Sequence, residues 1–181
     1  MNIEFLQTLV VEELRNLCDA DSQLSEMLPK MERASLSPEV AKAIYCRREL
    51  EKSQTDLLVG ILGRFNVRPS GGHCHAMRGL LEEAEEVLRR ESGVYPARLE
   101  PRLLAVLRKV AHLRITALNC VIAVTRLLEA TEIEKTLADC VSQEVEADRF
   151  VAGLADDMLR LIVANSIDET ASALKALNQY T

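Results

Sequence analysis

Long apolar stripes at helical spacing run through most of the chain. One face, read in alternating steps of three and four, carries Leu104, Leu107, Ala111, Arg114, Leu118, Val121, Thr125 and Leu128. Another carries Val10, Leu14, Leu17, Asp21, Leu24, Leu28 and Met31. This spacing is that of one side of an amphipathic α-helix. Each stripe has one charged residue near its middle, Arg114 in the first and Asp21 in the second.

Helix start and stop signals divide these stripes into separate elements. Ser37 and Pro38 provide an N-cap and a first helical residue, and Pro29 should bend the helix that contains it. Thr131 with Glu134 and Ser166 with Glu169 each read as a capping box. We therefore expect helices over residues 4–34, 38–65, 76–91 and 101–129, a further helix from 131, and a short C-terminal helix over about 166–180.

The lengths of the connections predict the topology. The first two long helices are joined by a few residues, and so are the last two, so each pair should form an antiparallel hairpin. Roughly 35 residues, including the short helix 76–91, separate the two hairpins and can cross the length of a bundle. The predicted fold is all-α, a ferritin-like four-helix bundle with a long crossover and a short C-terminal helix, formed by residues 1–181 as one domain.

Composition agrees with a helical protein and excludes some partners. Hydrophobic residues make up 48% of the chain, aromatic residues only 3%, and the formal net charge is −6. The basic residues are scattered among acids, so we expect no nucleic acid partner. The apolar runs are interrupted by charges before they reach the roughly 18 residues that span a bilayer, so we expect no membrane association and a cytoplasmic location.

The five cysteines are dispersed and resemble reduced core residues. One cluster stands out: His73, Cys74 and His75, which could supply part of a zinc site. Adjacent residues on one loop cannot easily close a tetrahedron, so the alternative is an ordinary loop and helix start.

Polar residues interrupt each long helix at a similar level. Asp21, Glu51, Gln54, Arg114 and Glu144 fall on or near the inward faces. Because buried polar groups are costly unless they are paired, we expect these side chains to meet. The Glu-x-x-His pairs typical of di-iron bundles are absent from the sequence, since Ser70, Gly72 and Lys109 stand three residues before the histidines.

Four segments resemble, in order and spacing, the ferritin-like stress proteins of the YciF/YciE type. They read DADSQLSEMLPKMERASLSPEV, CHAMRGLLEEAEEVL, VAHLRITAL and LADCVSQEVEAD, and the resemblance covers residues 9–160. Its most specific parts are Leu-Pro-Lys-Met at 28–31 and Cys-x-Ala-Met-x-Gly-Leu at 74–80. The resemblance implies a helical bundle, often dimeric, with a carboxylate di-iron type centre and no settled biochemical activity.

Carried over position by position, the resemblance also shows departures. Asp21 stands where family members have Glu, and Ala111 and Arg114 replace both acids of a Glu-His-Tyr-Glu run. Gln143-Glu144 replaces a Glu-Glu pair. Positions that match the family's ligands, or stand in for them, are Asp21, Glu83 and Glu144, with Glu51, Gln54 and Asp148 as further candidates, whereas Leu50 stands in place of an acid.

We hypothesise that Arg114 fills the space of the metals, with Asp21, Glu83 and Glu144 turned toward its guanidinium, because a planar group with five donors can satisfy several carboxylates. The alternative is that Arg114 extends to the edge of the bundle and is hydrated. Arg47 is expected on the surface, paired with Glu51 one turn later, rather than in the network.

Three classes of function remain. The preferred one is a non-enzymatic, metal-free, stress-associated relative of the YciF type that acts as a homodimer or through an unidentified protein partner. The second is an iron or manganese protein or oxidase with a reduced ligand set built on Asp21, Glu83 and Glu144. The third is a protein that senses oxidation through Cys74.

Overall fold

In the computed structural model, the described part of the chain is a bundle of five α-helices. The structure describes the backbone of residues 3–91 and 96–178 and the side chains of residues 3–91 and 98–164. No strand occurs in these ranges. The helices are α1 (Ile3–Ala34), α2 (Pro38–Arg64), α3 (His75–Glu91), α4 (Pro96–Leu127) and α5 (Thr131–Asn178). The all-helical class is therefore confirmed.

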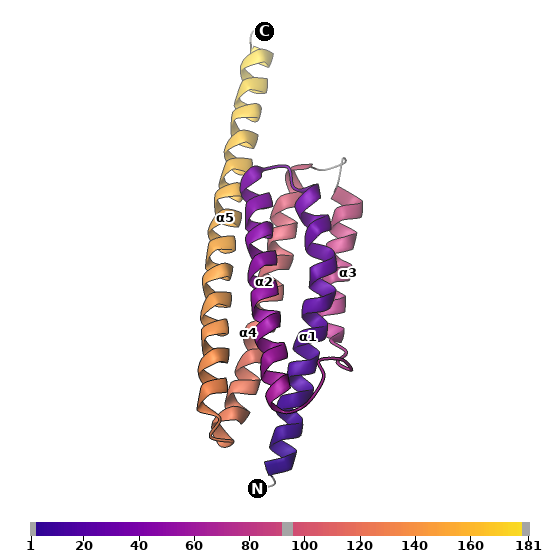
Figure 1. The fold of residues 1–181 in the computed structure, drawn as a ribbon. Coiled ribbons are helices and arrows are strands. Elements are labelled where there is room, and N and C mark those ends of the chain that lie inside the picture. Colours follow the sequence, from indigo (N-terminus) through magenta and orange to yellow (C-terminus); the bar gives the residue numbers. More distant parts are fainter. Residues whose placement is uncertain (1–2, 92–95, 179–181) are drawn as a thin grey trace.

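Two antiparallel hairpins and a crossover form the bundle (Figure 1). The most extensive helix contacts are those of α4 with α5 and of α1 with α2. Helix α3 runs back along the bundle, packed against α1 and α4, so that α4 begins at the same end as α2 (Figure 1). The expected long crossover with its short helix is thus confirmed, and it makes α2 and α4 parallel.

Helix α4 begins earlier than expected. Pro96 is its first residue, and Pro101, which we predicted as the start, lies inside the helix. The additional turn carries Glu100, whose carboxylate is 5% exposed and accepts hydrogen bonds from the backbone N–H of Leu36 (2.7 Å) and of Ser37 (2.6 Å). A helix start at residue 101 would leave out the residue that holds the α1–α2 turn.

The N-cap of α2 agrees with the sequence, whereas that of α5 does not. The Ser37 hydroxyl accepts a hydrogen bond from the backbone N–H of Val40 at 3.4 Å, and Pro38 follows it. At α5, the backbone N–H of Glu134 bonds to the carbonyl of Ala130, and the Glu134 carboxylate accepts from Arg126. The predicted capping box of Thr131 with Glu134 is therefore wrong, although the helix starts where it was expected.

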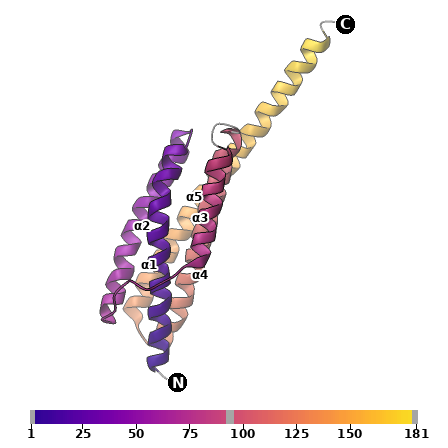
Figure 2. The same ribbon diagram turned by 90° about the vertical axis from the view of Figure 1, so that its right-hand side faces the viewer.

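The C-terminal segment is helical but is not a separate helix. Helix α5 continues without a break through residue 166 to Asn178, a length of 48 residues. Its last part leaves the bundle and extends beyond it, which is clearest in Figure 2. The predicted start at Ser166 is therefore wrong, because the backbone of α5 stays helical across it. The side chains of the predicted capping box lie outside the described ranges.

The core consists of two apolar clusters along the bundle axis. One, near the α1–α2 turn, includes Leu28, Met31, Met77 and Leu103. The other, toward the opposite end, is built around Leu14, Leu58, Leu118 and Leu137. Between the two in sequence, on α1, α2, α4 and α5, stand buried polar residues. The predicted apolar stripes of α1 and α4 thus supply both clusters, and their charged midpoints mark the layer between them.

One stretch of the described chain, Arg98–Leu127 of α4, is long and apolar enough to cross a membrane by length and mean hydropathy, which is 1.3. We did not expect such a stretch from the sequence, because charged residues interrupt its apolar runs. Helix α4 packs against α1, α3 and α5 and carries the buried Arg114. Because α4 is in contact with three other helices, its high apolar content is that expected of a central helix in a bundle.

Candidate functional site: a buried arginine and carboxylate network

Arg114 occupies the centre of the bundle. It lies on the apolar stripe of α4 and its side chain is fully buried, with 0% exposure. Asp21 of α1, Glu51 and Gln54 of α2 and Glu144 of α5 surround it, each at most 2% exposed. The helical spacing that keeps each stripe inward therefore brings at least one polar group from every long helix to the same place.

The guanidinium of Arg114 uses all three of its nitrogens. Nε donates to Glu144 Oε1 at 2.8 Å, Nη2 to Gln54 Oε1 at 2.7 Å and Nη1 to Glu51 Oε1 at 3.2 Å. Nη1 also forms an ion pair with Asp21. Because the group is planar with donors in fixed directions, it can bind partners on different helices at once.

A second arginine, Arg47 of α2, belongs to the same network. Its side chain is 5% exposed, donates to Glu51 Oε2 at 2.6 Å and pairs with Glu144. Our prediction of a surface position was wrong, although the expected pairing with Glu51 is present. The sequence held a usable signal, because Arg47, Glu51, Gln54 and Leu58 continue one inward stripe at steps of three and four.

Two polar side chains complete the hydrogen bonding. The Gln54 amide nitrogen donates to the carbonyl of Cys140 (3.3 Å) and to Gln143 Oε1 (3.0 Å). The Thr55 hydroxyl donates to Asp21 Oδ2 at 2.9 Å. The carboxylates of the network therefore have donors on several sides, as buried charges require.

The network contains two arginines and three carboxylates, so its formal charge is −1 when all are ionised. Burial raises the pKa of Glu51 to about 7, against the opposing effect of Arg47. For Glu144, the cost of burial is outweighed by Arg47 and Arg114, and its pKa is lowered. Burial alone would lower the pKa of Arg47, yet Glu51 and Glu144 raise it. One proton on Glu51 would make the network neutral.

Two of the predicted acids lie elsewhere. Glu83 of α3 is on the surface, where Lys109 Nζ donates to it at 2.6 Å, so its predicted place in the buried network is wrong. Glu83 does face α4, but it pairs with Lys109 on the solvent-exposed side of that helix and not with the buried Arg114. Asp148 of α5 accepts from Arg108 Nε at 2.9 Å and lies 3.3 Å from His112 Nε2.

The loop with His73, Cys74 and His75 is docked on α1. Asp19 accepts from the backbone N–H of Cys74 (2.7 Å), and Asn16 accepts from that of His73 (3.1 Å). A Cβ at Gly72 would collide with the backbone carbonyl of Arg15, so only glycine fits this approach. The loop thus joins α2 to α3 and is held against α1, in agreement with the alternative of an ordinary loop and helix start.

The two cysteines nearest the network are buried. They are Cys18 and Cys140, and burial raises the pKa of each thiol. Cys74 is half-buried, and all five cysteines of the chain are free. An oxidation-sensing role of Cys74 stays a prediction.

The residues present do not fit a di-metal centre. Within the described ranges, no three His, Cys, Asp or Glu side chains are arranged to hold a metal ion. Asp21, Glu51 and Glu144 converge, but two guanidiniums lie between them and use their oxygens. A cation placed there would lie directly against two positive charges. Two positions where the resemblance would place acids, Leu50 and Ala111, are apolar and line a neighbouring pocket.

Comparison with known proteins gives consistent matches. The family described as "Domain of unknown function (DUF892)" matches residues 6–164. Protein YciF of Escherichia coli (strain K12) is 25% identical over 156 residues, which cover 86% of this chain and 93% of YciF. The crystal structure of that stress protein superposes with a TM-score of 0.79 at 24% identity and covers 86% of this chain and 97% of its own.

Two further solved structures share the fold. YcfI of Rhodopseudomonas palustris, described as a candidate structural protein, matches with a TM-score of 0.75 at 23% identity, over 81% of this chain and 92% of that one. A DUF305 fragment from Deinococcus radiodurans matches with a TM-score of 0.65 at 14% identity, over 82% and 96%. At these identities the two structures establish the helical architecture alone.

Proposed function

Because the chain belongs to the DUF892 family and is homologous to the stress protein YciF, we propose that it is a non-enzymatic, stress-associated protein with a metal-free ferritin-like core. In this proposal the arginine and carboxylate network takes the place of a di-metal centre, and the protein acts by assembling with itself or with a partner protein.

The position of Arg114 carries this proposal. Its guanidinium lies between Asp21, Glu51 and Glu144, the acids that could otherwise act as ligands. Arg47 adds a second positive charge to the same layer. Carboxylate oxygens that are already bound by fixed cations are poor metal ligands, because binding a metal would require both buried arginines to lose their partners.

The outer part of α5 supports assembly as the mode of action. Where α5 leaves the bundle, Leu159, Leu161 and Val163 are 50%, 63% and 59% exposed. Apolar side chains gathered on a projecting helix are typical of a surface that another chain covers. We propose a homodimer formed through this segment, with a cytoplasmic location that agrees with five free cysteines.

Metal analysis tests the proposal against an iron or manganese protein. Protein purified without chelator, then incubated with Fe²⁺ under anaerobic conditions and desalted, is analysed for bound iron and, on exposure to air, for oxygen consumption. We expect far less than one iron per chain and no oxygen consumption above that of free Fe²⁺. Stoichiometric iron with turnover would contradict the proposal and favour the oxidase.

A matched pair of variants tests whether the buried arginines prevent metal binding. Arg114→Glu removes the central charge and adds a carboxylate where the family resemblance expects one. Its metal content is compared with that of Arg126→Glu, which changes an exposed arginine of the same helix. We expect increased Fe²⁺ or Mn²⁺ retention only in the first variant, provided that circular dichroism shows both to be folded.

A further inference from the structure

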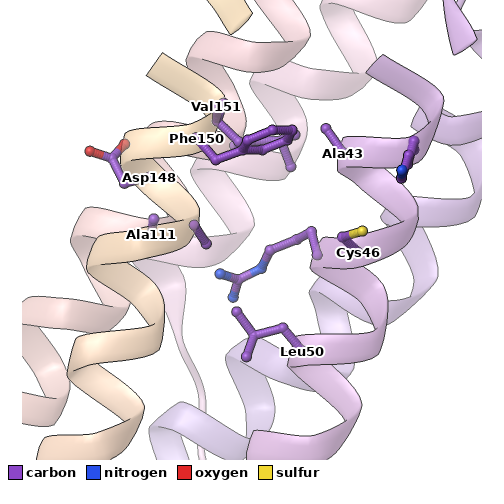
Figure 3. Close-up of a pocket in the computed structure, with 11 residues that line it drawn as sticks. Ala43, Cys46, Leu50, Ala111, Asp148, Phe150 and Val151 are labelled. Carbon is purple, nitrogen blue, oxygen red and sulfur yellow. The ribbon is translucent and has the colours of Figure 1, made fainter. Parts of the chain in front are cut away.

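A pocket opens beside the network, between α2, α4 and α5 (Figure 3). Its volume is about 400 Å³. The walls are largely apolar, with Ala43 and Leu50 on α2, Ala111 on α4 and Val151 on α5. In Figure 3, Phe150 reaches from α5 toward Ala43, whereas the carboxylate of Asp148 points away from the opening. Pockets of this size and apolar character are typical of small-molecule sites.

One charged side chain in the wall has an unused hydrogen-bond donor. Arg47 lines the pocket and is 5% exposed. Its two terminal nitrogens bind Glu51 and Glu144, but its Nε has no hydrogen-bond partner. A buried N–H without an acceptor costs free energy. The Nε is covered by neighbouring side chains, so a bound molecule supplies an acceptor to it only if a side chain in the wall changes rotamer.

The charge of the neighbouring network selects the kind of acceptor. Arg47 is already neutralised by two carboxylates, and the network as a whole carries three acids against two arginines. An anionic group brought to the Arg47 Nε would therefore be repelled at short range by Glu144, and by Glu51 when it is ionised, in a region of low dielectric constant. A neutral oxygen would accept the N–H without that repulsion.

We propose that this pocket binds a small, uncharged apolar molecule with one oxygen acceptor, such as a medium-chain alcohol or ketone, whose oxygen accepts the Nε–H of Arg47. The volume accommodates on the order of a dozen non-hydrogen atoms, if each takes about as much space as a water molecule in the liquid, ~30 Å³. The hydrocarbon chain then lies along Ala43, Leu50 and Val151. This site is independent of the proposed assembly role.

A tryptophan reporter tests the proposal directly. The chain contains no Trp, so Phe150→Trp places a single indole at the pocket. We expect a saturable change in its emission on titration with 1-octanol. Octanoate, which has the same chain length and an anionic head, should bind at least tenfold more weakly. No saturable change up to the solubility limit, or equal binding of octanoate, would overturn the proposal.

A filled pocket provides the matched control. Ala147→Leu, made together with Phe150→Trp so that the reporter is retained, adds bulk to the wall on α5. Ala138→Leu makes the same change on an exposed part of the same helix. We expect the first substitution to weaken octanol binding at least tenfold and the second to leave it unchanged, with similar melting temperatures. Binding that both variants retain would place the ligand elsewhere and reject the site.

The same reporter detects a competing occupant. If a second copy of the chain closes the pocket, the emission should shift with protein concentration in the absence of octanol, and octanol should not bind to the associated form. That result would overturn the small-molecule proposal. We expect instead that octanol affinity is the same across a concentration series that spans any self-association.

Discussion

Arg114 is a positive charge with no access to water, held by groups from three other helices. A buried arginine of this kind stabilises the fold only while its partners stay in place, because removing one side leaves the other charged and unpaired. Its contribution to stability is therefore measured by a substitution that removes the charge from an otherwise unchanged site.

Replacing Arg114 by leucine tests this dependence. Arg114→Leu leaves Asp21, Glu51 and Glu144 without their shared donor, and we expect the free energy of unfolding to fall by about 3 to 5 kcal/mol. Urea denaturation at pH 7 measures the change. Arg126→Leu, at an exposed ion pair of the same helix, should cost less than about 1 kcal/mol. Equal losses of unfolding free energy in the two variants would show that the buried network contributes no more to stability than an exposed ion pair.

Glu51 should make stability depend on pH. Its pKa is raised from 4.5 to about 7, so its contribution is fully present below about pH 4.5 and is lost as the pH rises through 7, when the buried group must ionise. From pH 5 to 8 we expect a loss of about 2 to 3 kcal/mol that Glu51→Gln abolishes. Urea midpoints of both proteins across this range measure it.

The acids with lowered pKa values do not contribute to the change in stability between pH 5 and pH 8. The pKa values of Glu144 and Asp148 are lowered, so their contributions are present above about pH 4.5 and are lost only at more acidic pH. Arg47, Arg114 and Glu144 face Glu51 in both proteins being compared. A pH dependence that is identical in wild type and Glu51→Gln would refute the assignment.

At the scale of elements, periodicity predicted the helices well because burial sets their spacing. The stripes of α1 and α4 are buried along nearly their whole length, including the charged residues at their midpoints. Boundaries were harder to predict where tertiary contacts decide them. Glu100 makes the first turn of α4 necessary by binding the α1–α2 turn, and no local signal in the sequence announces that contact.

The burial of a site residue could be predicted where it interrupts a clear apolar stripe. It could not be predicted for Arg47 and Glu83. Asp21 and Arg114 interrupt apolar stripes, so burial follows from spacing. Arg47 was misplaced because a nearby acid one turn away equally fits a surface pair. Glu83 was misplaced because it was carried over from the resemblance alone, without a test of which way α3 turns it.

The crossover depends on one glycine at its contact with α1. Gly72→Ala would place a Cβ against the backbone carbonyl of Arg15, and backbone atoms cannot move aside without shifting the loop. We expect a loss of about 1 to 3 kcal/mol. Gly79→Ala, on α3 with open space around it, should be neutral or stabilising by up to about 1 kcal/mol. Thermal unfolding measures the melting temperatures of both variants. Equal values would contradict the close approach of Gly72 to the Arg15 backbone.

For the molecule as a whole, we propose that the projecting part of α5 is where two copies of the chain meet. Its outer part extends past the bundle with exposed apolar side chains, among them Leu161 and Val163. We expect sedimentation equilibrium to give twice the 20.2 kDa of one chain. Leu161→Asp with Val163→Asp should give monomers, whereas Ala138→Asp, at an exposed position within the bundle, should not. A monomeric wild type at about 100 μM would contradict this assembly.

We propose that guanidinium groups occupy the space where a metal centre would lie. Diffraction from crystals grown with millimolar Mn²⁺, collected for anomalous signal, distinguishes the two possible occupants. We predict continuous density for Arg114 and Arg47 between Asp21, Glu51 and Glu144, and no anomalous peak within that layer. One or two anomalous peaks among these carboxylates, with Arg114 turned out of the core, would show that the site binds metal.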